Sequence, residues 1–176
     1  MKKQRSIVLF LVKFFAAYFI LFTVYSLYLH HTQKKDELYS CSPITTLVAK
    51  QTADVLNMTG FNVIHQQNTN ELSVKLILNG QYIAKIIEGC NSVSVIILFL
   101  SFIFAFSGSF RITFIYSFLG STLIYGVNII RIAFLSVMLY KFPSQQEFLH
   151  DIIFPAIIYG LVFLLWVLWV QKFSKY

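Results

Sequence analysis

The chain has 176 residues, of which 57% are hydrophobic and 12% are charged, and its formal net charge is +7. Soluble domains carry about 25% charged residues, so this composition excludes an ordinary soluble protein and is typical of a polytopic membrane protein. The positive residues mostly flank apolar runs and form no basic stripe with interleaved aromatic residues. We therefore predict no nucleic-acid partner and interpret the lysines and arginines as topology signals.

Four apolar runs each reach the roughly 20 residues that cross about 30 Å of hydrocarbon. They are residues 7–29, 91–109, 112–130 and 152–170. The first run follows a basic start, but it is too long for a signal peptide and no small-x-small cleavage site follows it, which predicts an uncleaved anchor. The lysines and arginines that flank the runs fall on one side of a four-span arrangement, so both termini are predicted to be cytoplasmic.

The segment between the first two runs, residues 30–88, is long enough to form a small water-facing unit. Residues 41–60 predict a short amphipathic helix, with Ser42 as N-cap, Pro43 at the first helical position and Gly60 after its end. Its predicted apolar face contains Ile44, Leu47, Val48, Val55 and Leu56. Because so short a segment is marginal as an independent domain, we expect it to cap the outer ends of the spans.

A β-hairpin is predicted directly before the second span. Residues 71–88 alternate apolar and polar side chains on both sides of Asn79-Gly80, a dipeptide typical of type I′ turns. The predicted fold class is an all-α polytopic membrane protein with four transmembrane helices, N-in/C-in topology and a small α+β extracytoplasmic cap. The predicted domains are residues 1–29 (basic N-terminus and first span), 30–89 (cap) and 90–176 (membrane core with the other spans).

The third span continues past its expected end. Residues 112–140 would form one helix of about 43 Å, which is too long for the bilayer and too short for two crossings. We therefore expect this helix to tilt, to break near Gly126-Asn128 or to project beyond the membrane.

Three residues whose side chains could take part in catalysis come from different spans. Cys90 opens the second span, Arg131 lies near the outer end of the third, and His150 lies just before the fourth. Taken singly, Cys90 is better explained as a small apolar residue and His150 as a helix cap, while a snorkelling role explains Arg131 equally well. The four-span topology, however, places all three at the outer boundary. A thiol at a helix N-terminus, a neutral imidazole and a fixed cation are what acyl transfer through a thioester needs.

The supporting candidates are four neighbouring polar residues: Glu88, Asn91, Asn128 and Asp151. Glu88 or Asp151 could pair with Arg131 or orient His150, or both could be ordinary interfacial carboxylates. Asn128 lies three residues before Arg131 and can share its helix face.

The second cysteine, Cys41, is also predicted to lie outside, in an oxidising compartment. A disulfide with Cys90 would block the predicted nucleophile or make the pair redox-active. No Cys/His cluster has the spacing of a metal site, so we predict neither metal nor cofactor.

These motifs resemble those of a known family. "EGCNS" opening the second span, "NIIRI" in the third and "LHD" opening the last are similar to the cysteine, arginine and histidine motifs of the exosortase/archaeosortase family. Its members are integral membrane proteins proposed to act as cysteine transpeptidases on C-terminal sorting signals of secreted proteins. The resemblance covers residues 88–159 and looks closest to the F-type subfamily of Bacteroidetes. It implies that Cys90 is the nucleophile, Arg131 the motif arginine and His150 the motif histidine.

The resemblance also implies a setting and partners. The setting would be the inner membrane of a bacterium, with the site facing the periplasm. The partners would be secreted proteins with a C-terminal sorting signal and the lipid bilayer, with room for a small membrane accessory protein. Two features depart from the family, since many members have Ser-Gly where Asn91 and Ser92 follow the cysteine, and the usual bacterial members have more spans. Alternatives are a non-catalytic scaffold or assembly factor for surface-protein export, and a thiol–disulfide protein using Cys41 and Cys90.

Overall fold

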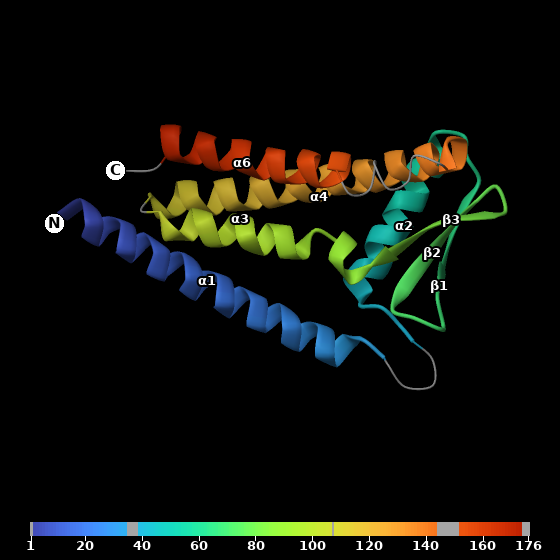
Figure 1. Cartoon of the computed structure of the whole chain (residues 1–176), viewed down its shortest axis with the longest axis horizontal. Coiled ribbons are helices and arrows are strands. Elements are labelled where there is room, and N and C mark those ends of the chain that lie inside the picture. The colour runs from blue at the N-terminus through green and yellow to red at the C-terminus, as the bar shows by residue number, and fades with distance from the viewer. Residues whose placement is uncertain (1, 35–38, 107, 144–151, 174–176) are drawn as a thin grey trace.

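The computed structural model describes residues 2–34, 39–106, 108–143 and 152–173. Its elements in chain order are α1 (Lys2–Thr32), α2 (Pro43–Met58), β1 (Val63–Gln67), β2 (Ser73–Leu78), β3 (Gln81–Ile87), the 3₁₀ turn η1 (Glu88–Cys90), α3 (Val93–Ala105), α4 (Phe110–Lys141) and α6 (Phe154–Lys172). Helices α1, α3, α4 and α6 run alongside one another, and α2 and the sheet lie together at one end (Figure 1). Helix α1 begins and α6 ends at the opposite end of this bundle.

Within the described residues, three helices are long and apolar enough to cross a membrane: Arg5–Thr32, Phe110–Lys141 and Pro155–Lys172. The helix of the second apolar run, α3, has 13 residues and is therefore only about 20 Å long, less than the hydrocarbon thickness. It is shorter than the predicted 91–109 at both ends. Asn91 and Ser92 form a turn before it, and the backbone of Phe106 is extended after it (φ −86°, ψ 142°).

The long third run forms one continuous helix, α4, of 32 residues. The expected break near Gly126-Asn128 does not occur. Three residues in its C-terminal half, Ile129, Ile132 and Ala133, instead share an apolar cluster with buried residues of α2 and the sheet. Helix α4 is about 48 Å long, which exceeds the hydrocarbon thickness of an ordinary bilayer, and its C-terminal half supports α2 and the sheet.

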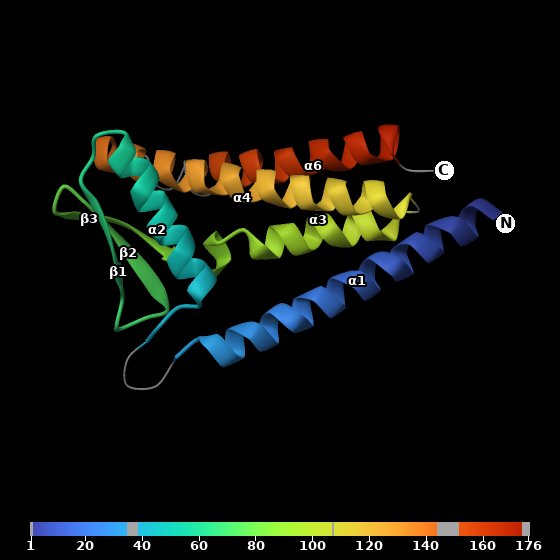
Figure 2. The same ribbon diagram turned by 180° about the vertical axis from the view of Figure 1, so that it is seen from behind.

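Helix α2 lies across the end of the bundle and packs against both the sheet and α4 (Figure 2). Its predicted start is confirmed, because the Ser42 hydroxyl accepts a hydrogen bond from the Thr45 N–H at 3.4 Å. The predicted apolar face is partly wrong, since Leu47 is 48% exposed. The buried residues are Thr45, Val48, Ala49, Thr52, Ala53 and Leu56. Thr52 tolerates burial because its hydroxyl donates to the Val48 carbonyl at 2.8 Å.

The sheet is antiparallel with the order β1-β2-β3. The predicted hairpin turn is confirmed, since Asn79 and Gly80 have φ values of +50° and +81°, the positive values that a type I′ turn requires. Strand β1 was not predicted. Its sequence, VIHQQ, is mostly polar, and its residues apart from Val63 are exposed or only partly buried, as suits an edge strand.

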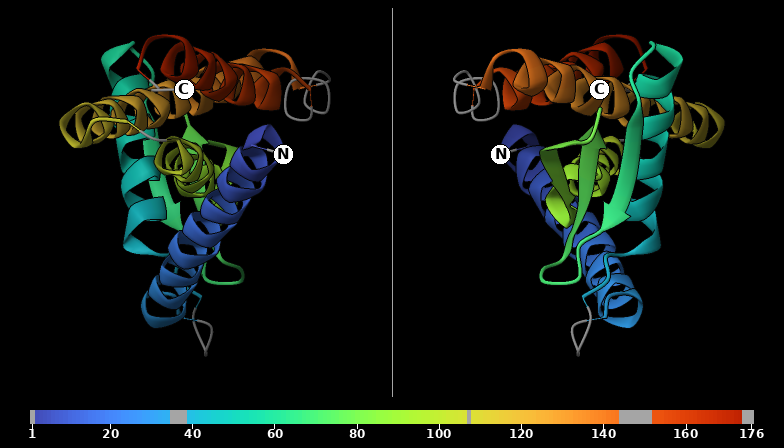
Figure 3. Two further views of the ribbon diagram at one scale, coloured as in Figure 1. Left: turned by 90° about the vertical axis from the view of Figure 1, so that its left-hand side faces the viewer. Right: turned by 90° about the vertical axis from the view of Figure 1, so that its right-hand side faces the viewer.

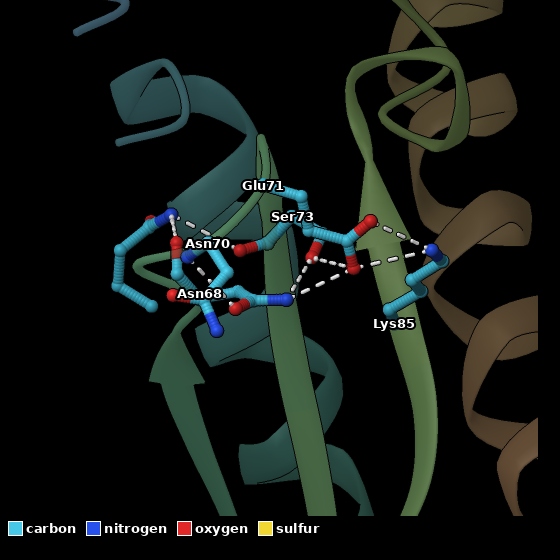
Figure 4. A network of polar contacts seen from close by, with 6 residues as sticks. Asn68, Asn70, Glu71, Ser73 and Lys85 are labelled. Atoms are coloured by element: carbon cyan, nitrogen blue, oxygen red, sulfur yellow. Dashed lines mark hydrogen bonds and ion pairs between the residues drawn. The ribbon is translucent and has the colours of Figure 1, made fainter. Parts of the chain in front are cut away.

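A polar network closes the turn between β1 and β2 (Figure 4). The Glu71 carboxylate accepts hydrogen bonds from Asn68 Nδ2 at 2.9 Å, the Ser73 hydroxyl at 3.0 Å and Lys85 Nζ at 2.9 Å. The hydrogen bond from Lys85 is the largest cause of the lowered pKa of Glu71. Because Lys85 belongs to β3, this network ties the turn to the far strand of the sheet.

Helix α3 is the centre of the bundle, with α1 on one side and α4 and α6 on the other (Figure 3). Aromatic rings make part of these contacts: Phe102 of α3 meets Phe10 of α1 edge-on, with ring centroids 5.7 Å apart, and stacks on Trp166 of α6 at 4.3 Å. Against α4 the packing depends on a small residue. A Cβ at Gly120 would overlap the ring of Phe99, which is fully buried.

We expect Gly120→Leu to destabilise the bundle by about 1–3 kcal/mol, because Phe99 must move before α3 and α4 can approach. Thermal unfolding of the purified membrane protein measures this. Gly126→Leu, on the same helix, is the matched control, since no atom lies within 4 Å of a Cβ built there. Combining Gly120→Leu with Phe99→Ala should restore part of the loss. An equal effect at both glycines would contradict the close packing.

Candidate functional site

Cys90 lies where the cap joins the bundle. Strand β3 leads directly into η1, whose last residue is Cys90, and α3 begins three residues later. The Cys90 side chain is half-buried and packs against the apolar cluster that includes Ile129 and Ile132 of α4. Its carbonyl oxygen accepts a hydrogen bond of 2.8 Å from Asn128 Nδ2. The residue predicted as nucleophile is therefore in direct contact with the helix that carries the predicted cation.

Arg131 follows one helical turn after Asn128. Asn128 is only 1% exposed, and Arg131 is half-buried. Cys90 and Tyr159 are ionisable groups close enough to interact electrostatically with the Arg131 guanidinium. Helix α4 thus brings an amide and a guanidinium to the Cys90 turn, as the spacing of Asn128 and Arg131 predicted.

His150 and Asp151 lie outside the described residues, so their predicted roles stay predictions. The helix that follows them, α6, reaches the site through Tyr159, which is 56% exposed. Tyr159 was not singled out from the sequence, because a tyrosine at the eighth residue of an apolar run carries no distinguishing pattern.

Glu88 is the centre of a polar network beside Cys90. Its carboxylate accepts hydrogen bonds from the Ser42 N–H at 2.7 Å, the Ser42 hydroxyl at 2.8 Å, the Thr45 hydroxyl and the Asn91 amide. Burial raises the pKa of this carboxyl, but hydrogen bonds from Ser42, Thr45 and Gln33 outweigh burial and lower the pKa below its ordinary value. Glu88 therefore joins the N-terminus of α2 to η1.

Asn91 is the second member of this network and is fully buried. Its Nδ2 donates to the Tyr25 hydroxyl at 2.8 Å and to the Thr45 hydroxyl at 3.0 Å, and its Oδ1 accepts from the Val93 N–H at 3.0 Å. Asn91 thus accepts a hydrogen bond from the first N–H of α3 and donates hydrogen bonds to residues of α1 and α2. Sequence reasoning named Asn91 and Glu88 but missed the hydroxyl partners Tyr25, Ser42 and Thr45, whose contacts join segments 43 to 66 residues apart.

Ser92 explains one departure from the family pattern. Its φ of +64° lies in the left-handed region, which glycine adopts at least cost. A glycine at this position, as in the Ser-Gly pair of many family members, suits the same backbone. The left-handed backbone of this turn therefore accommodates serine here and would accommodate glycine.

We expect Ser92→Val to destabilise the protein by about 1–3 kcal/mol, because a β-branched residue is strained at positive φ. Ser92→Gly should leave stability within about 1 kcal/mol of the wild type. The matched control is Ser94→Val, at an exposed helical position of α3. Thermal unfolding distinguishes the three variants, and equal midpoints for valine at positions 92 and 94 would contradict the assigned turn.

The two cysteines differ in their surroundings, and both are free thiols. Cys41 is 4% exposed, and burial raises the pKa of its thiol to about 11. Since the thiolate is the reactive form, Cys41 is poorly suited to nucleophilic or exchange chemistry near neutral pH. These surroundings favour a reaction that uses Cys90 alone over one that uses Cys41 and Cys90 as a redox pair.

The family model for transmembrane exosortases matches residues 6–170, which is most of the chain. The chain belongs to the transmembrane exosortase family. It is thus a multi-pass membrane protein, consistent with a membrane transpeptidase involved in protein sorting. The match extends beyond residues 88–159, where the sequence motifs first indicated the resemblance, and includes α1 and the cap. No curated protein and no solved structure matches the chain.

Proposed function

We propose that this exosortase is a cysteine transpeptidase or peptidase that cleaves the C-terminal sorting signals of secreted proteins. The observation that carries the proposal is the position of Cys90, whose carbonyl is bound by Asn128 one turn before Arg131. Membership of the exosortase family supports the reaction class. The small number of spans and the long outer segment favour the F-type subfamily.

In the proposed first step the Cys90 thiolate attacks the carbonyl carbon of the scissile peptide bond. His150 accepts the thiol proton, and the Arg131 guanidinium stabilises the negative oxygen of the tetrahedral intermediate. The C–N bond then breaks, and the leaving amine takes the proton from His150. The product is a thioester between the secreted protein and Cys90, while the C-terminal signal stays in the membrane.

In the second step an amine or a water molecule attacks the thioester carbonyl and transfers its proton to His150. The C–S bond breaks, the acyl group passes to the new nucleophile, and the Cys90 sulfur is released. Transfer to an amine is transpeptidation, and transfer to water is hydrolysis.

We also propose that the chain crosses the inner membrane four times and that the site faces the periplasm. Helix α3 is short, but it packs among α1, α4 and α6, the three helices that are long enough to cross a membrane (Figure 3). This position inside the bundle, together with the turn that precedes α3, supports a fourth crossing. The common end at which α1 begins and α6 ends supports an even number of crossings, with both termini in the cytoplasm (Figure 1). The basic residues before α1 point to the same orientation.

Mass spectrometry of secreted and surface proteins, from cells with and without this chain, tests the proposed reaction. We expect a set of proteins whose C-termini are shortened, or joined to an acyl acceptor, only when the chain is present. Hydroxylamine trapping should release the same proteins from the membrane fraction, because it cleaves thioesters. Identical C-termini in both cell types would exclude the proposal.

A further inference from the structure

We propose that the hydroxyl groups of Tyr25 and Thr45 position Cys90 by holding the side chain of Asn91. Tyr25 belongs to α1 and Thr45 to α2, so the inference gives two elements outside the reacting residues a part in the site. It rests on the proposed function in that Cys90 is taken as the reacting group.

The Asn91 amide is fully used. Its Nδ2 lies 2.8 Å from the Tyr25 hydroxyl, 3.0 Å from the Thr45 hydroxyl and 3.3 Å from a Glu88 carboxylate oxygen, while its Oδ1 accepts from the Val93 N–H. An amide offers two N–H donors, which the three acceptors around Nδ2 share, and one carbonyl, which accepts from Val93. Because Asn91 is fully buried, bulk water cannot replace the Tyr25 or Thr45 hydroxyl, so loss of either one shifts the amide toward the acceptors that remain.

This constraint passes to Cys90 through the backbone. Cys90 and Asn91 share one peptide group, and the carbonyl of that group accepts the hydrogen bond from Asn128. The peptide is therefore held from α4 at its oxygen, and from α1 and α2 through the side chain of Asn91. A change in the position of the Cys90 Cα requires that one of these hydrogen bonds lengthens or breaks.

Helix α1 is the element that gives Tyr25 this role. It packs mainly on α3, and at the inner end its Phe10 ring contacts Phe102 and Phe106, with centroids 5.7 and 4.7 Å apart. Tyr25 lies 15 residues further on, about 22 Å along the helix, and reaches Asn91 at the outer end. The first span thus has a specific polar contact beside the candidate site, which an anchor alone does not need.

Thiol alkylation of the full-length protein in membranes tests the inference without a substrate. In a Cys41→Ser background Cys90 is the sole thiol, and its rate of reaction with N-ethylmaleimide is measured. We expect Tyr25→Phe and Thr45→Val to release the half-buried turn and raise this rate about three- to tenfold, as the loss of one buried hydrogen bond predicts. Thr45→Ser keeps a hydroxyl and should restore the original rate.

Tyr28→Phe is the matched control, because Tyr28 lies on the same helix with its ring stacked against Tyr25 at 6.3 Å. Its rate should equal that of the background protein, and thermal midpoints should show that every compared variant is folded. Equal rates for Tyr25→Phe and Tyr28→Phe, or no rescue by Thr45→Ser, would overturn the inference. If instead Cys90→Ala leaves substrate processing intact, the proposed function fails, and the alkylation rates still decide the positioning role.

Discussion

Replacing Cys90 by alanine is expected to abolish C-terminal processing of the secreted substrates. The substitution removes the proposed nucleophile, and loss of a covalent nucleophile lowers turnover by a factor on the order of 10⁵–10⁶ in well-studied enzymes. Folding should be little affected, because Cys90 is half-buried in a turn and its sulfur makes no disulfide. Mass spectrometry of protein C-termini, in cells that contain equal amounts of wild-type and variant chain, measures the effect.

Cys41→Ser is the matched control for this experiment. Its thiol is buried and holds a proton near neutral pH, so we expect processing close to the wild type. Loss of processing in both variants would favour a thiol–disulfide reaction that uses the two cysteines. Normal processing with Cys90→Ala would favour a scaffold or assembly role and exclude a covalent mechanism.

The parts of the fold that sequence predicted correctly depend on local chemistry. Hydropathy located the long helices, Ser42 and Pro43 marked the start of α2, and Asn79-Gly80 marked the hairpin. The errors arise where tertiary contacts decide. Strand β1 is too polar to be recognised without its partner β2, and α3 is shortened by a turn that Asn91 stabilises through residues of α1 and α2.

The same distinction applies to the candidate site. The proximity of Asn128 and Arg131 was predictable because two residues three positions apart on one helix share a face, and Cys90 was singled out because it precedes an apolar run. The roles of Tyr25 and Thr45 were not predictable, since hydroxyl residues are common in these segments and their shared partner, Asn91, is distant in sequence. A single buried amide connects all of them, which is information that periodicity and spacing do not contain.

Arg131→Ala is expected to lower processing by about 10²–10³-fold, the usual cost of removing one group that stabilises an oxyanion. The guanidinium interacts with Cys90 across the site, and α4 fixes its position relative to the Asn128–Cys90 hydrogen bond. Arg131→Lys should recover part of the activity, because it keeps the charge but loses the planar array of donors. The measurement is again the fraction of substrate C-termini that are processed, normalised to the amount of folded chain.

Arg111→Gln provides the control for this prediction, since Arg111 is exposed near the start of the same helix. The other basic residues at the end proposed to be cytoplasmic preserve the proposed orientation of the chain, so processing should stay near the wild-type level. If Arg131→Ala reduced processing no more than Arg111→Gln, the arginine would be a helix-end residue and not part of the reaction. If Arg131→Lys were fully active, a positive charge alone would suffice to stabilise the oxyanion, and the planar array of donors of arginine would not be required.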